Sequence, residues 1–213
     1  MRTAAVVPAY NEATRIHAVL EAIGRAELVD ECIAVSDGST DGTYAEILSH
    51  PDVKAVELPH NQGKAAAMWA GVQQTDAPVL LFLDADLQGL QPSQVDDLLR
   101  PVLKGEAVMS LGVFRGGRFL TDLAQVLVPY ISGQRAMTRE FFLSVPNVQS
   151  VRYGVEVALA RHATRQHAQV KRVLLAGVTH PMKEEKLGAL RGVSSRLRMY
   201  YEILRFLLSW RRG

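Results

Sequence analysis

Short apolar runs alternate with amphipathic segments through the first half of the chain. The runs have the length of buried strands, and the segments between them carry apolar residues at helical spacing, for example Ile16, Val19 and Ile23. This pattern predicts strands at 3–7, 32–35, 53–58, 79–83 and 107–113, and helices at 12–26, 41–49, 64–74 and 91–104. Strands that alternate with such helices predict an α/β domain with parallel pairing through right-handed crossovers.

The polar clusters of this half follow the predicted strands. The run 79–83 (Val-Leu-Leu-Phe-Leu) is apolar throughout, which is typical of a strand covered on both faces. In such sheets, ligands bind beyond the carboxyl ends of the strands. Polar clusters at 8–12, 37–41 and 84–88 all fall at these ends, so the sequence predicts one shared site there. The second half is less regular, with helices predicted at 119–130, 155–167 and 194–211 and a strand at 170–175.

Composition narrows the class of protein. The chain has 213 residues, of which 48% are hydrophobic and 22% charged, and its formal net charge is +2. This charge is too balanced to indicate nucleic-acid binding. The single cysteine, Cys32, excludes an intrachain disulfide and gives no sign of an oxidising compartment. No signal peptide and no apolar run of about 18 residues is found, so we expect a cytoplasmic protein without a transmembrane helix, with contact to the inner face of a membrane left open.

Two carboxylates, Asp84 and Asp86, follow the apolar run 79–83. In an extended chain their side chains leave on the same side, and a cation between them relieves their repulsion. Mg²⁺ and Mn²⁺ take oxygen ligands, commonly carboxylates together with substrate phosphates. We therefore predict that this pair holds a divalent ion and a diphosphate, with Gln88 able to add an amide oxygen. The alternative is a solvated turn that caps the next helix.

The segment 36–43 (Ser-Asp-Gly-Ser-Thr-Asp-Gly-Thr) begins like a calcium-binding loop but has Leu48 where that loop needs a glutamate. A tight turn from strand to helix explains it better, with Gly38 permitting close backbone approach and Asp41 or Thr40 capping the helix. Asp37 is then left free at the strand end to accept hydrogen bonds from a base. Turn chemistry alone is the alternative.

Two further segments open predicted helices. In 8–12 (Pro-Ala-Tyr-Asn-Glu), backbone N–H groups can meet a nucleotide and Tyr10 can pack on its base. Lys64 follows Gly63 at a helix N-terminus, which is the positive end of the helix dipole. A lysine at this position suggests an anionic partner such as a diphosphate, and a solvated lysine is the alternative.

These segments together resemble family 2 glycosyltransferases, which have the GT-A fold. The matching segments are 7–12, 37–43, 61–64 and 82–88, in the order of the family. The chain resembles two branches most, the polyprenyl-phosphate sugar synthases and the glucosyl-3-phosphoglycerate synthases. One departure is Ser36, where many members carry a second aspartate. The resemblance implies a GT-A domain over 1–193, with a nucleotide-sugar half (1–115), an acceptor half (116–193) and a C-terminal helix at 194–213.

The resemblance also implies roles for single residues on the donor side. The polyprenyl branch uses the glutamine of its Asp-Ala-Asp-Leu-Gln run as a metal ligand, which matches Gln88. A late histidine completes the metal shell in several members, and His180 is the candidate here. The expected metal ligands are thus Asp84, Asp86, Gln88 and His180. The expected donor-binding residues are Pro8, Ala9, Tyr10, Glu12, Asp37, Gly63, Lys64, Asp84, Ala85 and Asp86.

The second half of the family binds the acceptor. Here the segment 131–136 resembles an acceptor-side loop, and 154–156 resembles the segment whose acidic residue faces the acceptor. Glu156 is accordingly expected to act in catalysis together with Asp86, although a first-turn glutamate also complements the helix dipole. The expected acceptor-binding residues are Arg115, Arg118, Gly133, Gln134 and Arg135.

The C-terminal segment is basic and apolar. Eight lysines and arginines lie within 183–213, and after Glu185 only Glu202 opposes them. As a helix, 194–212 has an apolar face wider than a surface helix needs, beside a stripe of arginines. This favours contact with a membrane interface, whereas packing on the domain and formation of a homodimer are the alternatives.

The resemblance implies transfer of a hexose from a nucleotide diphosphate sugar, with Mg²⁺ or Mn²⁺ as cofactor. A UDP-sugar is favoured and a GDP-sugar is the alternative donor. The terminal segment favours a polyprenyl-phosphate or other lipid acceptor over a soluble one such as 3-phosphoglycerate. A nucleotidyltransferase would be expected to carry a glycine-rich loop after the first strand, and 8–12 has none. A non-catalytic nucleotide-binding membrane scaffold is the remaining alternative.

Overall fold

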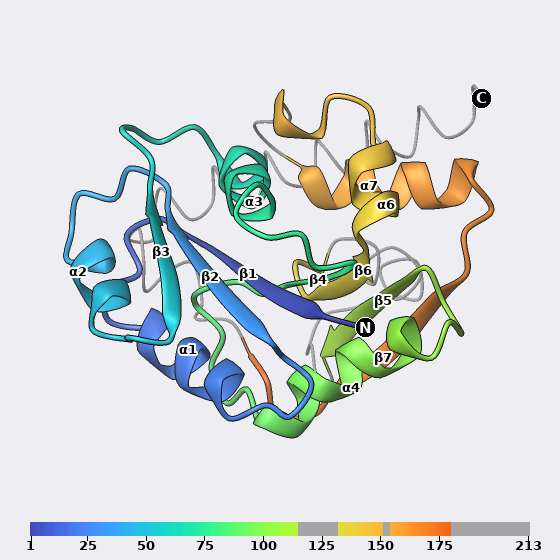
Figure 1. Ribbon diagram of the computed structural model, residues 1–213, viewed down its shortest axis with the longest axis horizontal. Coiled ribbons are helices and arrows are strands. Elements are labelled where there is room, and N and C mark those ends of the chain that lie inside the picture. Colours follow the sequence, from blue (N-terminus) through green and yellow to red (C-terminus); the bar gives the residue numbers. More distant parts are fainter. Residues whose placement is uncertain (115–131, 151–153, 180–213) are drawn as a thin grey trace, which may run out of the picture. The chain divides into compact units, whose positions relative to one another are not determined.

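The computed structural model describes residues 1–114, 132–150 and 154–179 (Figure 1). The strands there are β1 (Thr3–Ala9), β2 (Glu31–Ser36), β3 (Val53–Glu57), β4 (Val79–Phe82), β5 (Met109–Phe114), β6 (Arg135–Thr138) and β7 (Val170–Leu175). The helices are α1 (Ile16–Gly24), α2 (Thr43–Leu48), α3 (Lys64–Val72), α4 (Pro92–Leu103), α6 (Arg139–Ser144) and α7 (Val155–Arg165), with a 3-10 turn at Val148–Ser150. The helices predicted at 119–130 and 194–211, and the boundary predicted at 193, lie outside the described residues.

The strands form one sheet in the order β3-β2-β1-β4-β6-β5-β7. β6 pairs antiparallel with both of its neighbours, and the other neighbouring strands pair parallel. The expectation of a mostly parallel sheet is confirmed. The reading of 131–136 as a loop is wrong in part, because the chain enters β6 at Arg135. β6 has only four residues, which are too few to show an alternation of apolar and polar positions in the sequence. Its pairing with β4 and β5 defines it as a strand.

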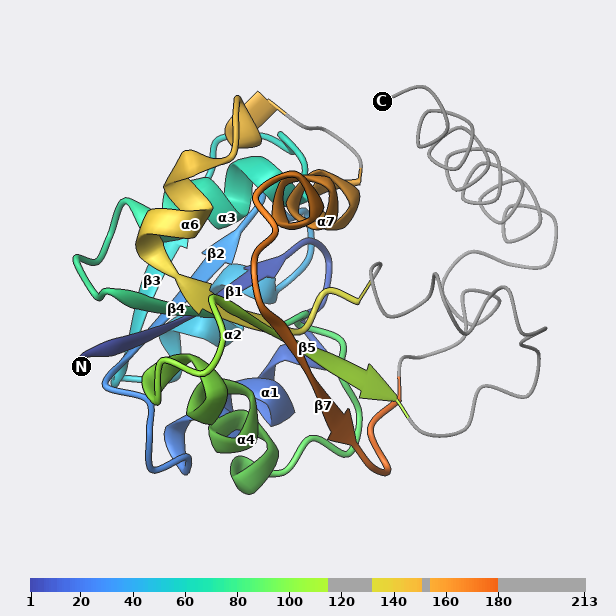
Figure 2. The same cartoon turned by 90° about the vertical axis from the view of Figure 1, so that its right-hand side faces the viewer.

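Helices cover both faces of the sheet. α1, α2 and α4 lie on one face, and α3, α6 and α7 on the other (Figures 1 and 2). Successive side chains of a strand point to opposite faces. Val7 and Leu81 accordingly pack with the first set of helices, whereas Val6 and Phe82 pack with the second. The double cover explains why the run 79–83 is apolar throughout.

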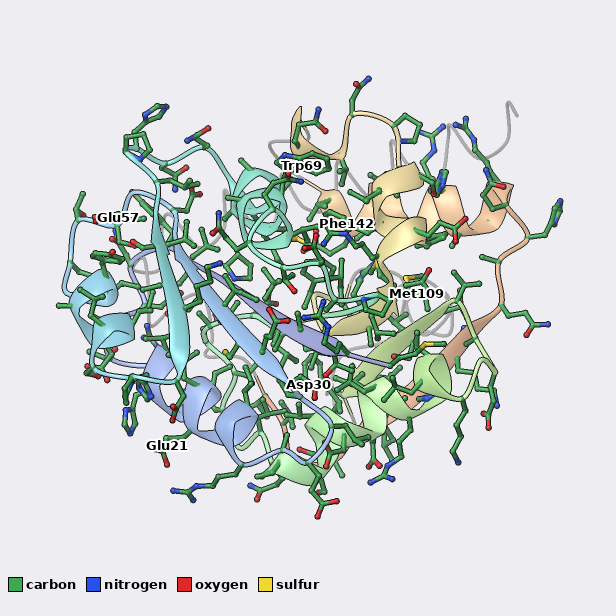
Figure 3. The ribbon with its side chains drawn as sticks, viewed as in Figure 1. Glu21, Asp30, Glu57, Trp69, Met109 and Phe142 are labelled. Atoms are coloured by element: carbon green, nitrogen blue, oxygen red, sulfur yellow. The ribbon has the colours of Figure 1, made fainter. Side chains whose placement is uncertain are left out.

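Aromatic packing holds α3 and α6 against β4. The rings of Trp69 and Phe142 are 6.3 Å apart, and those of Phe82 and Phe142 are 5.0 Å apart. Figure 3 shows Trp69 and Phe142 together on this face of the sheet. α3 begins at Lys64 and β4 leads into Asp84, so this packing joins the two elements that carry these residues.

The described helices are shorter than the apolar spacing predicts. α1 begins at Ile16 rather than at residue 12, because the preceding residues form a turn in which Asn11 has a φ of 55°. α2 begins at Thr43 with Gly42 at its N-cap position, which has no side-chain cap, so the prediction that Asp41 or Thr40 caps this helix is wrong. The Asp41 carboxylate instead accepts the backbone N–H of Thr43 over 2.9 Å in the turn before the helix. Among the described helices, none has the length and the apolar composition needed to cross a bilayer.

Candidate functional site

The sheet topology gathers the polar segments at one edge. β1, β2 and β4 run parallel, so the residues that follow them lie at the same edge of the sheet. β6 runs the other way and begins at this edge, where Arg135 pairs with Phe82. Residues 133–135 therefore come beside the residues that follow β4. An antiparallel strand thus brings part of the second half of the chain into the predicted site.

Asp84 is held from two sides. Its Oδ1 lies 2.5 Å from the Nζ of Lys64, and its Oδ2 accepts a hydrogen bond of 2.8 Å from the side-chain amide of Gln134. The Asp84 side chain is 20% exposed, so the carboxylate can still be reached from solvent. Lys64 and Gln134 together fix the orientation of this carboxylate.

Gly133 leaves no room for a side chain beside this pair. A β-carbon built on it would clash with Asp84 Oδ2 and lie 2.6 Å from Lys64 Nζ. The Asp84–Lys64 ion pair therefore leaves space for glycine only at position 133. The resemblance pointed to Gly133 as part of the acceptor side, and the structure gives its place against the carboxylate that follows β4.

Glu156 joins the same cluster from α7. Its Oε1 accepts a hydrogen bond of 2.6 Å from Lys64 Nζ. The buried guanidinium of Arg135 lies on the other side, where it donates to the backbone carbonyls of Ser132 and Glu156. Arg135 is 1% exposed, which is unusual for an arginine. The cations of Lys64 and Arg135 thus lie close to the carboxylates of Asp84 and Glu156.

The electrostatics fix the charge states in this cluster. Burial alone would raise the pKa of Glu156, but the charge and hydrogen bond of Lys64, with the charge of Arg135, lower it below its ordinary 4.5. Burial alone would lower the pKa of Lys64, but Asp84 and Glu156 raise it above 10.5. Burial lowers the pKa of Arg135 to about 10, although the charges of Glu156 and Asp84 act to raise it. At neutral pH Glu156 is therefore ionised, and the lowered pKa makes it a weaker general base than an ordinary glutamate.

Asp37 is buried and its carboxylate is engaged, so the expectation that it is left free is wrong. One oxygen accepts the backbone N–H of Gln62 and the other that of Gly63, each at 2.8 Å. Gly63 has a φ of 97°, a conformation that favours glycine, and it immediately precedes α3. Asp37 therefore holds the loop that delivers Lys64. Sequence reasoning missed this role because its partners are backbone groups of a distant loop.

The segments after β1 and β2 form one unit. The N–H of Thr40 donates to the side-chain oxygen of Asn11 over 2.9 Å, and the N–H of Glu12 donates to the hydroxyl of Thr43 over 2.9 Å. Tyr10 is 46% exposed on this unit and presents a ring to solvent. The side chains of Pro8 and Ala9 are buried within β1, so only their backbone can take part in binding a ligand.

The segment 84–88 offers oxygen ligands of the kind that Mg²⁺ and Mn²⁺ take. Asp84 and Asp86 are both partly exposed, whereas Ala85 between them is buried. Gln88 has an exposed side chain, and its backbone pairs with Thr179 through bonds of 2.9 and 3.0 Å. The residues fit a divalent ion by their chemistry. Three of the predicted site residues lie outside the described residues, namely Arg115, Arg118 and His180.

Comparison with known proteins gives the family of the chain. The family model described as Glycosyl transferase family 2 matches residues 4–152. The glucosyl-3-phosphoglycerate synthase of Mycobacterium tuberculosis is 31% identical over 192 residues, which covers 72% of this chain and 58% of that protein. A dolichyl-phosphate beta-glucosyltransferase of Trichomonas vaginalis is 39% identical over 98 residues, which covers 39% of this chain and 29% of that protein.

A solved structure extends the likeness to the fold. The crystal structure of the M. tuberculosis synthase with Mn²⁺, UDP-glucose and phosphoglyceric acid has a TM-score of 0.69 and 28% identity, and the match covers 88% of this chain and 75% of that one. The expected GT-A fold is confirmed. The chain spans only 58% of the length of the curated synthase. Since the family model covers well over half of the chain, the chain belongs to glycosyl transferase family 2.

Proposed function

We propose that this chain transfers a hexose from a UDP-sugar to a phosphorylated acceptor, with Mg²⁺ or Mn²⁺ as cofactor. The observation that carries the proposal is the bridge made by Lys64, whose ammonium contacts Asp84 at 2.5 Å and Glu156 at 2.6 Å. It couples the carboxylate expected to bind the donor to the carboxylate expected to face the acceptor. A GDP-sugar is the alternative donor.

On the donor side, Asp84 and Asp86 would hold the divalent ion, with the exposed Gln88 as a further ligand. The ion, when bound, neutralises charge on the departing diphosphate. Lys64 begins α3, and a helix N-terminus with a lysine attracts phosphate oxygens. The exposed ring of Tyr10 is available to pack on the base. Tyr10 belongs to the segment after β1, which is hydrogen-bonded to the segment after β2.

On the acceptor side, Glu156 orients the acceptor hydroxyl by accepting its hydrogen bond. The lowered pKa of Glu156 and its ion pair with Lys64 support orientation rather than proton removal. Gln134 and Arg135 contribute through their neighbours, because one holds Asp84 and the other holds the carbonyls of Ser132 and Glu156. These two residues therefore set the shape of the acceptor side.

The acceptor we favour is a soluble phosphorylated acid such as 3-phosphoglycerate. The likeness to the synthase named for this acceptor covers 72% of the chain, whereas the likeness to the dolichyl-phosphate enzyme covers 39%. A polyprenyl phosphate is the second candidate, supported by the Asp-Ala-Asp-Leu-Gln run at 84–88 and by that second relative. Membrane contact and a homodimer through 194–213 stay predictions, since that segment lies outside the described residues.

Thermal stabilisation by nucleotide sugars tests the donor. A ligand that binds only the folded state raises the melting temperature. We expect UDP-glucose to do so when Mn²⁺ or Mg²⁺ is present, and GDP-mannose to do so less. Incubation of labelled donor with 3-phosphoglycerate or a polyprenyl phosphate then tests the acceptor. Labelled product from the lipid alone would select the second candidate, and neither stabilisation nor transfer with any donor would overturn the proposal.

A further inference from the structure

Three side chains with metal-binding groups converge between α1 and α2, which lie next to each other on one face of the sheet (Figure 1). His17 belongs to the first turn of α1, Glu46 to α2, and His50 follows the end of α2. The Nδ1 of His17 lies 3.2 Å from a carboxylate oxygen of Glu46 and 3.1 Å from the Nε2 of His50. The same Glu46 oxygen lies 3.8 Å from His50 Nε2.

A single proton can serve these three groups only if it is shared among them, as in a three-centre hydrogen bond. The Nδ1 of His17 carries at most one hydrogen, so it can donate to Glu46 or accept from His50, but not both. In the first case Glu46 and the lone pair of His50 share one N–H, and in the second the lone pair of His17 faces a carboxylate. The two rings are tilted by 50° with centroids 5.0 Å apart, so stacking does not account for their approach. A cation accepts all three lone pairs at once.

The distances fit a tetrahedral ion. Zinc bonds of about 2.0–2.2 Å to nitrogen and oxygen place ligand atoms of a tetrahedron about 3.3–3.5 Å apart. The three separations here, 3.1, 3.2 and 3.8 Å, lie on either side of that range. Two histidines and one carboxylate are a ligand set that zinc accepts with a fourth position left to water. The His17 side chain is 59% exposed, so solvent reaches the cluster.

We propose that His17, Glu46 and His50 form a zinc site that links α1 to α2. Imidazole nitrogen favours zinc over Mg²⁺ and Mn²⁺, which take oxygen ligands, so this site is chemically distinct from the one at Asp84 and Asp86. The two helices follow the segments 8–12 and 37–43, which hydrogen bonds already join. Zinc would therefore brace the helices behind the proposed nucleotide site, and its binding does not depend on the proposed function.

Calorimetric titration of the full chain with zinc chloride, in an excess of Mg²⁺, tests the proposal. We expect one zinc per chain in the wild-type protein. His17→Ala and His50→Ala should each weaken binding by at least about 10-fold, because loss even of partners of a metal ligand costs about 10- to 100-fold. His17 is an exposed helical residue, so its replacement by alanine leaves folding intact.

Two variants separate this site from other sources of zinc binding. His167→Asn removes a histidine that follows α7, and asparagine tolerates its φ of 48°, so zinc affinity should match the wild type. Asp86→Asn should also keep the wild-type zinc affinity. Zinc should raise the melting temperature of the wild type but not of His17→Ala, and acid should abolish the effect because protonated imidazole does not bind metal.

Three outcomes would overturn the proposal. The first is the absence of zinc binding by the wild type, and the second is unchanged affinity in both histidine variants. The third is affinity lost in Asp86→Asn but kept in His17→Ala, which would assign the ion to the Asp84–Asp86 segment. None of these outcomes bears on sugar transfer.

Discussion

Lys64 and Glu156 are 92 residues apart in the sequence, and their side chains are joined by a hydrogen-bonded ion pair of 2.6 Å. Lys64 begins α3 and Glu156 lies in the first turn of α7, and both helices cover the same face of the sheet (Figure 2). The same ammonium contacts Asp84. A change at either carboxylate therefore alters the charge balance of the other, which links the donor side of the proposed site to the acceptor side.

Glu156→Gln removes one charge while keeping the shape of the side chain. We expect donor affinity to change by no more than a few-fold, because Lys64 keeps its contact with Asp84 when the charge of Glu156 is removed. We expect kcat to fall about 100-fold, which is the order of loss when a substrate group is misplaced by about 1 Å. Calorimetry with the donor and steady-state kinetics measure the two effects. Glu140→Gln, at an exposed position of α6, is the control, and equal kcat in both variants would contradict the role of Glu156.

The ion pair of Glu156 also predicts how stability depends on pH. The folded-state pKa of Glu156 lies below its ordinary 4.5, so the pair contributes stability above that pH and loses it as pH falls through the folded-state value. The pKa of Lys64 is raised above 10.5, so its contribution is lost only at higher pH. At neutral pH the free energy of unfolding of the wild type should exceed that of Glu156→Gln by about 1–3 kcal/mol. The difference should shrink below pH 4.5 in urea unfolding, and a difference independent of pH would refute the pairing.

Gly133→Ala places a methyl group against the Asp84–Lys64 pair. The new carbon would lie 2.6 Å from Lys64 Nζ, so the pair must move apart. We expect at least about 10-fold lower kcat/KM with a folded protein, because the displaced groups are polar and partly exposed. Gly24→Ala, where a β-carbon meets nothing within 4 Å at the end of α1, should leave activity unchanged and add about 0.5–1 kcal/mol of stability.

Much of this fold can be predicted from the sequence, because its strands are short apolar runs and its first helices have clear apolar spacing. The three polar clusters at the strand ends follow from the same pattern. β6 cannot be found this way, since its four residues gain their strand character from β4 and β5. The contact between Gln134 and Asp84 depends on that pairing and so was out of reach as well.

Asp37 shows a second limit of sequence reasoning. Its sequence neighbours mark a turn, but its partners are backbone N–H groups of Gln62 and Gly63, which no pattern of side chains records. Arg135 shows a related limit, because its burial also depends on residues distant in the sequence. As a charged residue in a predicted loop it suggests a surface position, whereas its strand lies between two others and buries it.

Asp37→Asn tests the anchoring of the loop before Lys64. The amide can accept only one of the two N–H groups, so one partly buried bond is lost, at a cost of about 1–3 kcal/mol. Denaturant unfolding measures this loss. Asp52→Asn, at an exposed turn, should change stability by no more than about 0.5 kcal/mol. Equal stability of the two variants would show that the loop does not depend on the Asp37 carboxylate.

The most direct test of the proposed site is the metal dependence of donor binding in Asp86→Ala. The wild-type melting temperature should rise with UDP-glucose only when Mn²⁺ is present, and Asp76→Ala, at an exposed position before β4, should behave in the same way. Asp86→Ala should show no Mn²⁺-dependent rise. If Asp86→Ala binds the donor with unchanged Mn²⁺ dependence, the assignment of the metal and diphosphate to the segment 84–88 is wrong.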